Sequence, residues 1–195
     1  MKKFAGFEDA KAKMGGDFTP LPKDGYELKI LSVKEAANKN GGTRFDIAFD
    51  IANGEFKDYF KNLYQDRKQQ NEDTKWPNDA IYRLNIPDDA SEQWMKDQFK
   101  TFTTCLEESN SGYHFDWNEQ LWKGKLFGGL FRIEQTEYQG KVYDHTRLKW
   151  VTTVDKIREK KFNLPKDKLI EKESETTPDG FVNVPEGIAD ELPFD

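Results

Sequence analysis

The sequence predicts a mainly β fold with one inserted helix, followed by a flexible acidic tail. Apolar and polar residues alternate along short segments early in the chain, one stretch near the middle has apolar residues at helical spacing, and the C-terminal stretch loses both patterns. The 195 residues are enough for one folded domain with extensions. We expect an N-terminal arm over 1–23, a folded body over 24–163 and a tail over 164–195.

The composition fits a folded body with polar extensions. Hydrophobic residues make up 35% of the chain and charged residues 34%, with a mean hydropathy of -0.93, but the 14% aromatic content argues against wholesale disorder. Cys105 is the single cysteine, so an internal disulfide is excluded and no zinc-ligand spacing is present. Because the chain lacks a signal-peptide pattern and a bilayer-length apolar run, we expect a soluble, cytoplasmic protein without membrane contact.

The first elements are a lead-in arm and a β-hairpin. The arm ends in "FTPLPKDG", whose prolines and Asp-Gly pair signal a turn. The segment "GYELKILSV" (25–33) places Tyr26, Leu28 and Ile30 on one strand face, and "TRFDIAFDI" (43–51) alternates after the Gly-rich turn "NKNGG". The inward set of this second strand is Phe45, Ile47, Phe49 and Ile51. The outward set is Arg44, Asp46, Ala48 and Asp50.

A third strand is expected next, followed by a charged loop. In "NGEFKDYFKNLY" (53–64), Asn53-Gly54 is a tight-turn signal between apolar runs, which predicts a turn and a strand. The segment "QDRKQQNEDTKWPND" (65–79) is predicted to be a mobile loop. It carries Arg67, Lys68 and Lys75 beside Trp76.

A helix and further strands complete the predicted body. The stretch "PDDASEQWMKDQFKTFTTCLEESN" (87–110) predicts a helix whose apolar face also holds Cys105, and Asp89 with Glu92 suggests a capping box. The residues at helical spacing are Met95, Phe99, Phe102 and Leu106. The stretch 121–154 then returns to strand, with Gly128-Gly129 indicating a bulge or bend and "YQGKVY" a hairpin turn.

This order of elements is the one expected of an OB-fold, a partly open five-stranded barrel with a helix between its third and fourth strands. A β-sandwich uses similar strands, so periodicity alone leaves the choice between the two open.

Signals of catalysis are weak. His114 and His145 do not lie in a metal-ligand spacing, and "GKLFGG" lacks the Lys-Ser/Thr pair of a phosphate loop. Asp46 and Asp50 share a strand face and raise the alternative of a metal-dependent nuclease, but a solvated outer face is the preferred interpretation. We therefore predict no enzyme, no cofactor and no metal site.

Basic residues interleaved with aromatic ones suggest a different chemistry. Proteins hold single-stranded nucleic acid with cationic grooves that follow the phosphates and with rings on which bases stack, at about 1–3 kcal/mol per stack. Trp76 is favoured among the rings because it lies in a polar loop without an obvious core partner. The candidate DNA-binding residues are Arg44, Lys57, Tyr59, Lys61, Tyr64, Arg67, Lys68, Trp76, Tyr82, Arg83, Arg132, Tyr138, Lys141, Tyr143 and Arg147.

The formal charge of -6 is concentrated at the C-terminus. Residues 164–195 contain nine acidic residues and three lysines, whereas residues 1–163 contain 27 of each sign. A purely solubilising tail would not explain the apolar Leu192, Pro193 and Phe194. A partner pocket with an apolar floor and a basic rim would bury the Phe194 ring and pair with Asp190 and Glu191.

Two kinds of sequence block resemble known families. The end "ADELPFD" resembles the acidic tip through which bacterial single-stranded-DNA-binding proteins recruit replication and repair enzymes. The blocks "GEFKDYFKNLY", "EESNSGYHFDWNEQLWKGKLFG" and "TRLKWVTTVDKIREKKFNLPK" are similar to blocks in single-stranded-DNA-binding proteins of phages that infect Gram-positive bacteria.

The resemblance implies an OB-fold body that coats single-stranded DNA during phage replication and recombination, in the cytoplasm of an infected bacterial host. It also implies that replication or recombination proteins dock on the tip, Asp190, Glu191, Leu192, Pro193, Phe194 and Asp195. The chain departs from the bacterial pattern in one respect, because Asp195 follows the phenylalanine that is otherwise terminal.

A competing interpretation is a protein-interaction factor, such as a recombination mediator or a host-modulating phage protein, whose body does not bind DNA directly. Oligonucleotide binding discriminates between the two. The sequence leaves the oligomeric state open, and a homo-oligomer is compatible with it.

Overall fold

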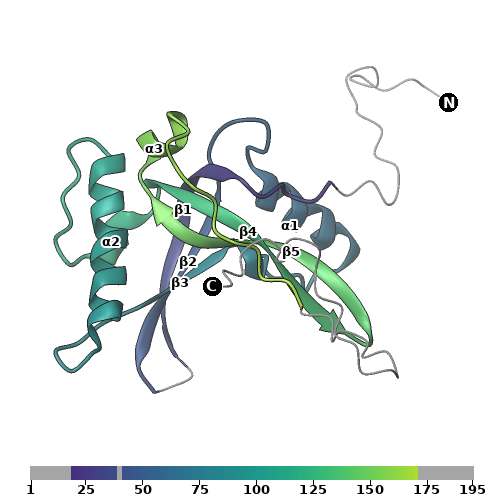
Figure 1. Ribbon diagram of the computed structural model, residues 1–195, viewed down its shortest axis with the longest axis horizontal. Coiled ribbons are helices and arrows are strands. Elements are labelled where there is room, and N and C mark those ends of the chain that lie inside the picture. The colour runs from purple at the N-terminus through teal and green to yellow at the C-terminus, as the bar shows by residue number, and fades with distance from the viewer. Residues whose placement is uncertain (1–18, 39–40, 171–195) are drawn as a thin grey trace, which may run out of the picture.

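The alternating segments near the start of the chain form the first two strands of the computed structural model, which describes residues 19–38 and 41–170 (Figure 1). Strand β1 spans Gly25–Ala37 and pairs antiparallel with β2, Thr43–Ile51. The predicted inward residues of β2 are all buried. The polar side chains of this strand lie on its opposite face. A register shift between Ile30 and Ser32 places a bulge in β1.

Three further strands complete one antiparallel sheet. They are β3 (Ile81–Asn85), β4 (Leu126–Tyr138) and β5 (Lys141–Thr152), and the order across the sheet is β3-β2-β1-β4-β5. The fold is therefore mainly β, as predicted. The sheet is not closed, because its two outer strands, β3 and β5, do not pair with each other.

Helices cover two ends of this sheet. Helix α1 spans Tyr59–Gln70, α2 spans Gln93–Ser109 and the short α3 spans Val154–Arg158. Single turns of 3-10 helix occur at Asn78–Ala80 (η1) and Glu119–Trp122 (η2). Figure 1 shows α2 and α1 on opposite sides of the strands.

The strand predicted within 53–64 is wrong, because this segment forms a turn followed by α1. Phe56, Tyr59, Phe60 and Leu63 repeat at helical spacing, and Phe60 is buried against the core. The carboxylate of Asp50 accepts the backbone N–H groups of Phe60 and Lys61, each at 3.0 Å, and so holds the start of the helix. The predicted loop over 65–79 is thus helical as far as Gln70.

Helix α2 confirms the apolar face predicted in the middle of the chain. Phe99, Phe102, Cys105 and Leu106 are buried. The capping box is wrong, because the helix begins at Gln93 after an N-cap at Glu92 whose side chain makes no capping hydrogen bond.

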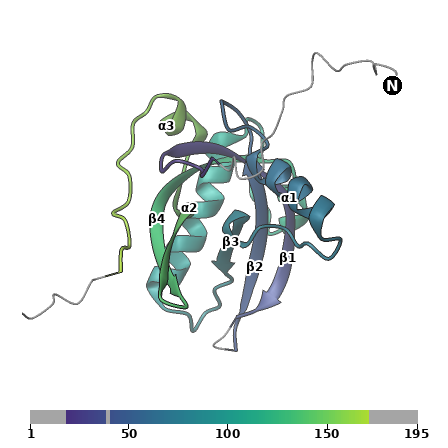
Figure 2. The same cartoon turned by 90° about the vertical axis from the view of Figure 1, so that its right-hand side faces the viewer.

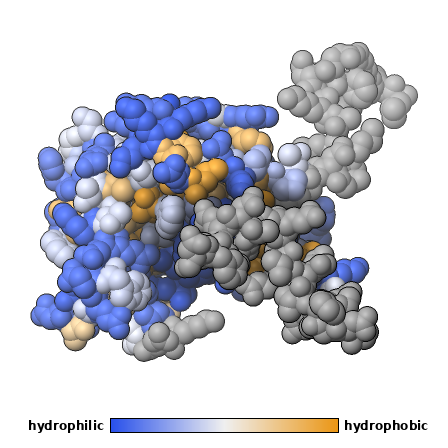
Figure 3. All heavy atoms as spheres, in the orientation of Figure 1, coloured by the Kyte–Doolittle hydropathy of each residue, from blue (hydrophilic) through white to orange (hydrophobic). Residues whose placement is uncertain are grey.

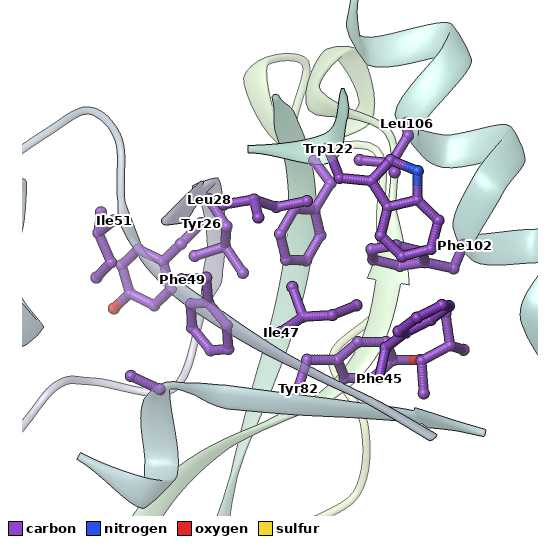
Figure 4. Packing of buried hydrophobic residues seen from close by; sticks show 14 of the residues in the cluster. Tyr26, Leu28, Phe45, Ile47, Phe49, Ile51, Tyr82, Phe102, Leu106 and Trp122 are labelled. Atoms are coloured by element: carbon purple, nitrogen blue, oxygen red, sulfur yellow. The ribbon is translucent and has the colours of Figure 1, made fainter. Parts of the chain in front are cut away.

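The core lies between the sheet and α2 (Figure 4) and is rich in aromatic rings. Trp122 is fully buried and meets Phe45 and Phe102 edge to face, each at a centroid distance of 5.3 Å. At the other end, Phe49 meets Phe60 of α1 at 5.8 Å. Each such ring contributes about 1.5–3 kcal/mol through burial, so these contacts fix both helices on the sheet.

The β4–β5 hairpin has the predicted turn and irregularity. Gln139 and Gly140 connect the strands with φ angles of 51° and 72°, which a type I′ turn requires. A Cβ atom on Gly128 would lie 2.7 Å from the backbone oxygen of Thr153, so only glycine allows this close approach. The register shifts between Leu130 and Phe131, immediately after the glycine pair.

The stretch expected to begin the tail lies along β4. Lys168 N–H donates to the Ile133 carbonyl and Gln135 N–H donates to the Lys168 carbonyl, both at 2.9 Å, on the edge of β4 that β1 leaves uncovered. Figure 2 shows this stretch running beside β4. The folded body therefore continues past the expected boundary at Leu164, to Ile170.

The surface is predominantly hydrophilic on the face that Figure 3 displays, with apolar residues gathered near its centre. None of the helices in the described ranges combines the length and the apolar character that a membrane span needs. Residues 1–18, and the tip over 190–195 on which partner docking was predicted, lie outside the described residues.

Candidate nucleic-acid interface

A groove of about 730 Å³ lies between α1 and the β4–β5 hairpin. We call it the seam groove. The seam is the place where β5 approaches η1 and the start of β3 without backbone pairing. Helix α1 contributes Tyr59, Leu63 and Arg67, the η1 region contributes 77–79, and β5 contributes 143–147. The end of the arm, 20–23, forms another part of its lining.

Side chains rather than backbone bonds span the seam. Arg147 Nε of β5 donates to Asp79 Oδ1 of η1 at 2.9 Å, and His145 Nδ1 lies 3.6 Å from the other oxygen of Asp79. Arg147 also lies 3.5 Å from Glu134 of β4. The ion pair between Arg147 and Asp79 therefore links β5 to η1, the turn that precedes β3.

Hydrogen bonds to Tyr59 hold the end of the N-terminal arm in the seam groove. Its hydroxyl accepts the Leu21 N–H at 3.1 Å and donates to the Thr19 carbonyl at 3.2 Å. Thr146 Oγ1 donates to the Leu21 carbonyl at 2.5 Å, and the Leu21 side chain is buried. Burial raises the pKa of Tyr59 above its ordinary value, so this hydroxyl stays protonated and able to donate near neutral pH.

Four predicted DNA-binding residues line the seam groove together: Tyr59, Arg67, Tyr143 and Arg147. Lys57, Lys61, Tyr64 and Lys68 lie on or just before α1, and Tyr138 and Lys141 lie at the tip of the hairpin. Tyr138 is 66% exposed and Tyr143 is 45% exposed, which leaves both rings accessible for stacking.

Five of the predicted cations are unpaired within the described part of the chain. Their ammonium or guanidinium groups make no ion pair with a described carboxylate, and all five belong to the α1 region or the hairpin tip. They are Lys57, Lys61, Arg67, Lys68 and Lys141. Of these five cations, Arg67 lines the seam groove, and the other four lie elsewhere in the α1 region or at the hairpin tip.

Trp76 has a structural role that the sequence did not reveal. Its ring packs against the core, and its Nε1 donates to the Ala80 carbonyl at 3.3 Å. Tyr64 lies against Trp76 with ring centroids 5.6 Å apart, and Lys68 Nζ lies 5.6 Å from the Tyr64 centroid. The reason for favouring Trp76, the lack of a core partner, is therefore wrong.

Arg44 and Arg83 do not line the groove but lie on the outer face of β2 and β3, where Arg83 also donates to Asn78 Oδ1 at the groove's margin. Arg44 Nε is 2.7 Å from Asp46 Oδ1, and Arg83 Nε is 3.8 Å from the same atom. Arg132 is engaged elsewhere, at 2.5 Å from Glu134 on β4. The charges of Arg132 and Arg147 and the hydrogen bond from Arg132 outweigh burial and lower the pKa of Glu134.

Tyr82 is not available to a nucleic acid. It is 8% exposed, lies on the inward face of β3 and stacks on Phe102 with centroids 5.5 Å apart. Burial raises its pKa to about 12. Its candidate role in stacking on bases is corrected to a role in the core, because strand alternation places it beside the buried Leu84.

The solvated outer face expected for Asp46 and Asp50 is wrong for Asp50, which the start of α1 covers, and both carboxylates have structural partners. Asp50 is 3% exposed and accepts three backbone N–H groups, from Ile51, Phe60 and Lys61, while Asp46 is held by arginines. Burial raises the pKa of Asp50 despite these hydrogen bonds. Within the described ranges, no three acidic, histidine or cysteine side chains converge as a metal site would require.

The charge of residues 1–163 is unevenly distributed along the chain, although its net value is zero. Residues 87–119, which include α2, contain eight acidic residues and two lysines. The remainder of residues 1–163 contains 25 basic and 19 acidic residues. A polyanion is therefore repelled by the segment 87–119, whereas the six basic residues in excess elsewhere are spread over the rest of residues 1–163.

The sequence analysis did not identify three exposed tryptophan rings. Trp94, Trp117 and Trp150 are each about half exposed or more, although tryptophan is usually well buried. Trp150 follows the alternation of β5, which could have identified it as outward-facing. Nothing local marks Trp117, whose position depends on the packing of a loop against α2.

Comparison of the chain with protein-family models and with curated proteins gives no match.

Proposed function

We propose that the chain is an OB-fold protein that binds and coats single-stranded DNA with little sequence preference, in phage replication and recombination. The tip over 190–195 recruits partner proteins in this proposal. The observation that carries it is the seam groove, which Arg67 and Tyr143 line together, with further cations on α1 and at the hairpin tip that make no ion pair with a described carboxylate. This combination serves a strand that offers phosphates on one side and unstacked bases on the other.

The topology supports the OB-fold. The OB connection order consists of three strands in meander order, a helix, and a hairpin that returns beside the first strand. Strands β1 to β3, helix α2 and the β4–β5 hairpin follow this order. An OB barrel is completed by an approach of its third and fifth strands, and here the Arg147–Asp79 pair spans that position. The lack of backbone pairing at the seam is compatible with the partly open character of OB barrels.

The DNA path that we propose follows the seam groove from α1 to the hairpin tip. Arg67 and Lys68 of α1 contact phosphates on one side, and Lys141 does so on the other. Tyr143 and Tyr138 present their rings between these cations. Because no base-edge pattern is required for stacking, the binding has little sequence preference.

The test is a titration of labelled oligo-dT by fluorescence anisotropy at several salt concentrations. If the five unpaired cations each displace one counterion, the logarithm of the affinity falls with the logarithm of salt concentration at a slope of about -3.5. Arg67→Gln reduces the magnitude of this slope by about 0.7. Lys100→Gln, on α2, is the matched control and leaves it unchanged. No binding at low salt rejects the proposal and favours the protein-interaction factor.

The tail acts as a competitor in this proposal. Seven acidic residues follow Lys172, and the last described residue, Ile170, donates its N–H to Gln135 Oε1 on the hairpin. The tail thus starts beside the proposed DNA path, at a high effective concentration. Truncation after Lys172 is expected to tighten oligo-dT binding at low salt and to abolish partner recruitment. Unchanged affinity contradicts the competition, and retained recruitment contradicts the docking role of the tip.

A further inference from the structure

A second hollow lies at the opposite end of the body, between α2 and the loop that follows it. We call it the α2 hollow. Its volume is about 650 Å³, and Phe99, Phe115 and Trp117 form its aromatic part. The charged residues of its lining are Asp88, Asp89, Glu107, Lys96 and Lys100. None of these residues belongs to the proposed DNA path. The hollow therefore calls for a different occupant.

Trp117 gives the α2 hollow an open apolar surface. Its side chain is 81% exposed, and its ring lies nearly parallel to that of Phe99, with centroids 6.1 Å apart and an interplanar angle of 15°. Phe115 supports it from the side at 5.1 Å. Only one face of the indole is therefore covered by the protein, and the other can bury a second apolar group.

The charge around this hollow selects the occupant. The segment 87–119 has a formal charge of -6. One of its two lysines, Lys96, already donates to the Asp89 carbonyl at 2.8 Å. Nucleic acid and the acidic tip over 190–195 are therefore both repelled, whereas a basic segment with aromatic side chains is attracted.

The chain contains such a segment outside the described residues. We propose that residues 2–7, "KKFAGF", dock in the α2 hollow of a neighbouring copy of this chain. Lys2 and Lys3 match the acidic surroundings, and Phe4 or Phe7 supplies the ring that covers the open face of Trp117. No acidic residue occurs among these six.

The docking is between copies because the arm is anchored at the far end of its own body. Leu21 is buried in the seam groove beside α1, and α2 lies on the opposite side of the strands (Figure 1). A body of 150 residues has a diameter of about 40 Å. Even with Phe4 as the docked ring, residues 5–18 reach at most about 50 Å when fully extended, less than the roughly 60 Å of half the circumference of such a body. They are too short to pass around the curved surface to the hollow of the same copy.

This contact is heterologous, because it joins two different surfaces of the protein. It therefore adds copies in a row and does not close a symmetric dimer. The contact itself is independent of DNA. Its consequence, cooperative coating of a long strand, rests on the proposed function, because a row with one polarity places successive seam grooves along the same strand.

The experiment uses two full-length variants that each lack one half of the contact. Phe4→Ala/Phe7→Ala keeps the hollow, and Trp117→Ala keeps the arm. In sedimentation velocity at high protein concentration and low salt, the wild type is expected to form species larger than dimers, and each variant alone is expected to be monomeric. A mixture of the two restores a one-to-one complex, because one arm finds one hollow. Trp94→Ala, which removes an exposed tryptophan of α2 outside the hollow, is the control and behaves as wild type.

Several results overturn the inference. If both variants still associate, or if their mixture does not, the arm and the hollow are not partners. A labelled peptide of residues 1–12 is expected to bind Phe4→Ala/Phe7→Ala but not Trp117→Ala, and a peptide of residues 186–195 to bind neither. Binding of the acidic peptide instead reverses the assignment of the occupant. A wild type that stays monomeric also contradicts it.

DNA binding is measured separately, so that the two proposals fail independently. Both variants are expected to bind an oligo-dT long enough for one copy with wild-type affinity, and to lose cooperativity only on long strands. Absence of binding to the short oligonucleotide rejects the proposed function and leaves the sedimentation result standing.

Discussion

Arg147 Nε donates a hydrogen bond to Asp79 Oδ1 at 2.9 Å, across the seam where β5 and β3 do not pair. The same guanidinium approaches Glu134 at 3.5 Å. Two carboxylates thus neutralise a cation that lines the seam groove. The carboxylates that hold Arg147 in place also reduce the attraction of this cation for phosphate.

Removal of the Asp79 charge is expected to tighten DNA binding. In Asp79→Asn the amide oxygen can still accept from Arg147, but the cation is no longer neutralised from this side. Because exposed ion pairs contribute about 0–1 kcal/mol, oligo-dT affinity at low salt should rise up to about fivefold. Anisotropy titrations measure this change. Asp97→Asn on α2 removes the same charge away from the groove, and an equal gain there would show a general charge effect only.

Tyr143 is expected to contribute a base stack. Tyr143→Ala should weaken oligo-dT binding by about 1–3 kcal/mol, since each ring that stacks on a base contributes that amount. Tyr82→Phe is the matched control, because Tyr82 is buried on the inward face of β3. Its hydroxyl accepts a hydrogen bond from Gln98. Equal affinities for wild type and Tyr143→Ala would remove this ring from the DNA path.

Asp50 is expected to stabilise the junction of β2 and α1. Asp50→Ala leaves three backbone N–H groups without their acceptor and should lower the free energy of unfolding by about 1–3 kcal/mol. Asp50→Asn keeps one acceptor oxygen and should cost less, because burial already disfavours the charge and raises the pKa of Asp50. Urea unfolding measures both. Asp46→Ala, on the same strand, should cost less than about 1 kcal/mol.

Glu134 is expected to make stability depend on pH in the acid range. Its pKa is lowered in the folded state from the ordinary 4.5, through the hydrogen bond from Arg132 and the charges of Arg132 and Arg147, against the effect of burial. The ionised carboxylate therefore stabilises the fold above the ordinary value, and this contribution is lost as the pH falls through the lowered pKa.

The measurement compares wild type with Glu134→Gln by urea unfolding between about pH 7 and pH 3. The difference in the free energy of unfolding should be largest at neutral pH and should shrink toward pH 3. Glu137→Gln, at an exposed position of the same strand, is the control. A difference that grows toward low pH would contradict the sign of this linkage.

The sequence was sufficient where the decisive pattern is local. Alternation predicted β1 and β2 with their buried faces, helical spacing predicted α2, and "YQGKVY" predicted the β4–β5 turn. The same reasoning misassigned 53–64, because a turn signal before an apolar run does not distinguish a strand from a helix. The contact between Phe60 and Phe49 and the hydrogen bonds from the start of α1 to Asp50 settle that choice, and both depend on how α1 packs back against β2.

The candidate site depended on tertiary structure to a greater degree. Composition identified basic and aromatic residues as a set, but it could not separate Tyr82 in the core from Tyr143 at the surface, or Arg44 in an ion pair from Arg67 without one. Burial and pairing are decided by side chains that approach from other elements. The sequence by itself determined which chemical groups are available. It also determined that strands have one apolar face and that the C-terminal end is acidic. The fold decided which cations and rings meet in one groove, because only packing brings residues 67, 79 and 147 together.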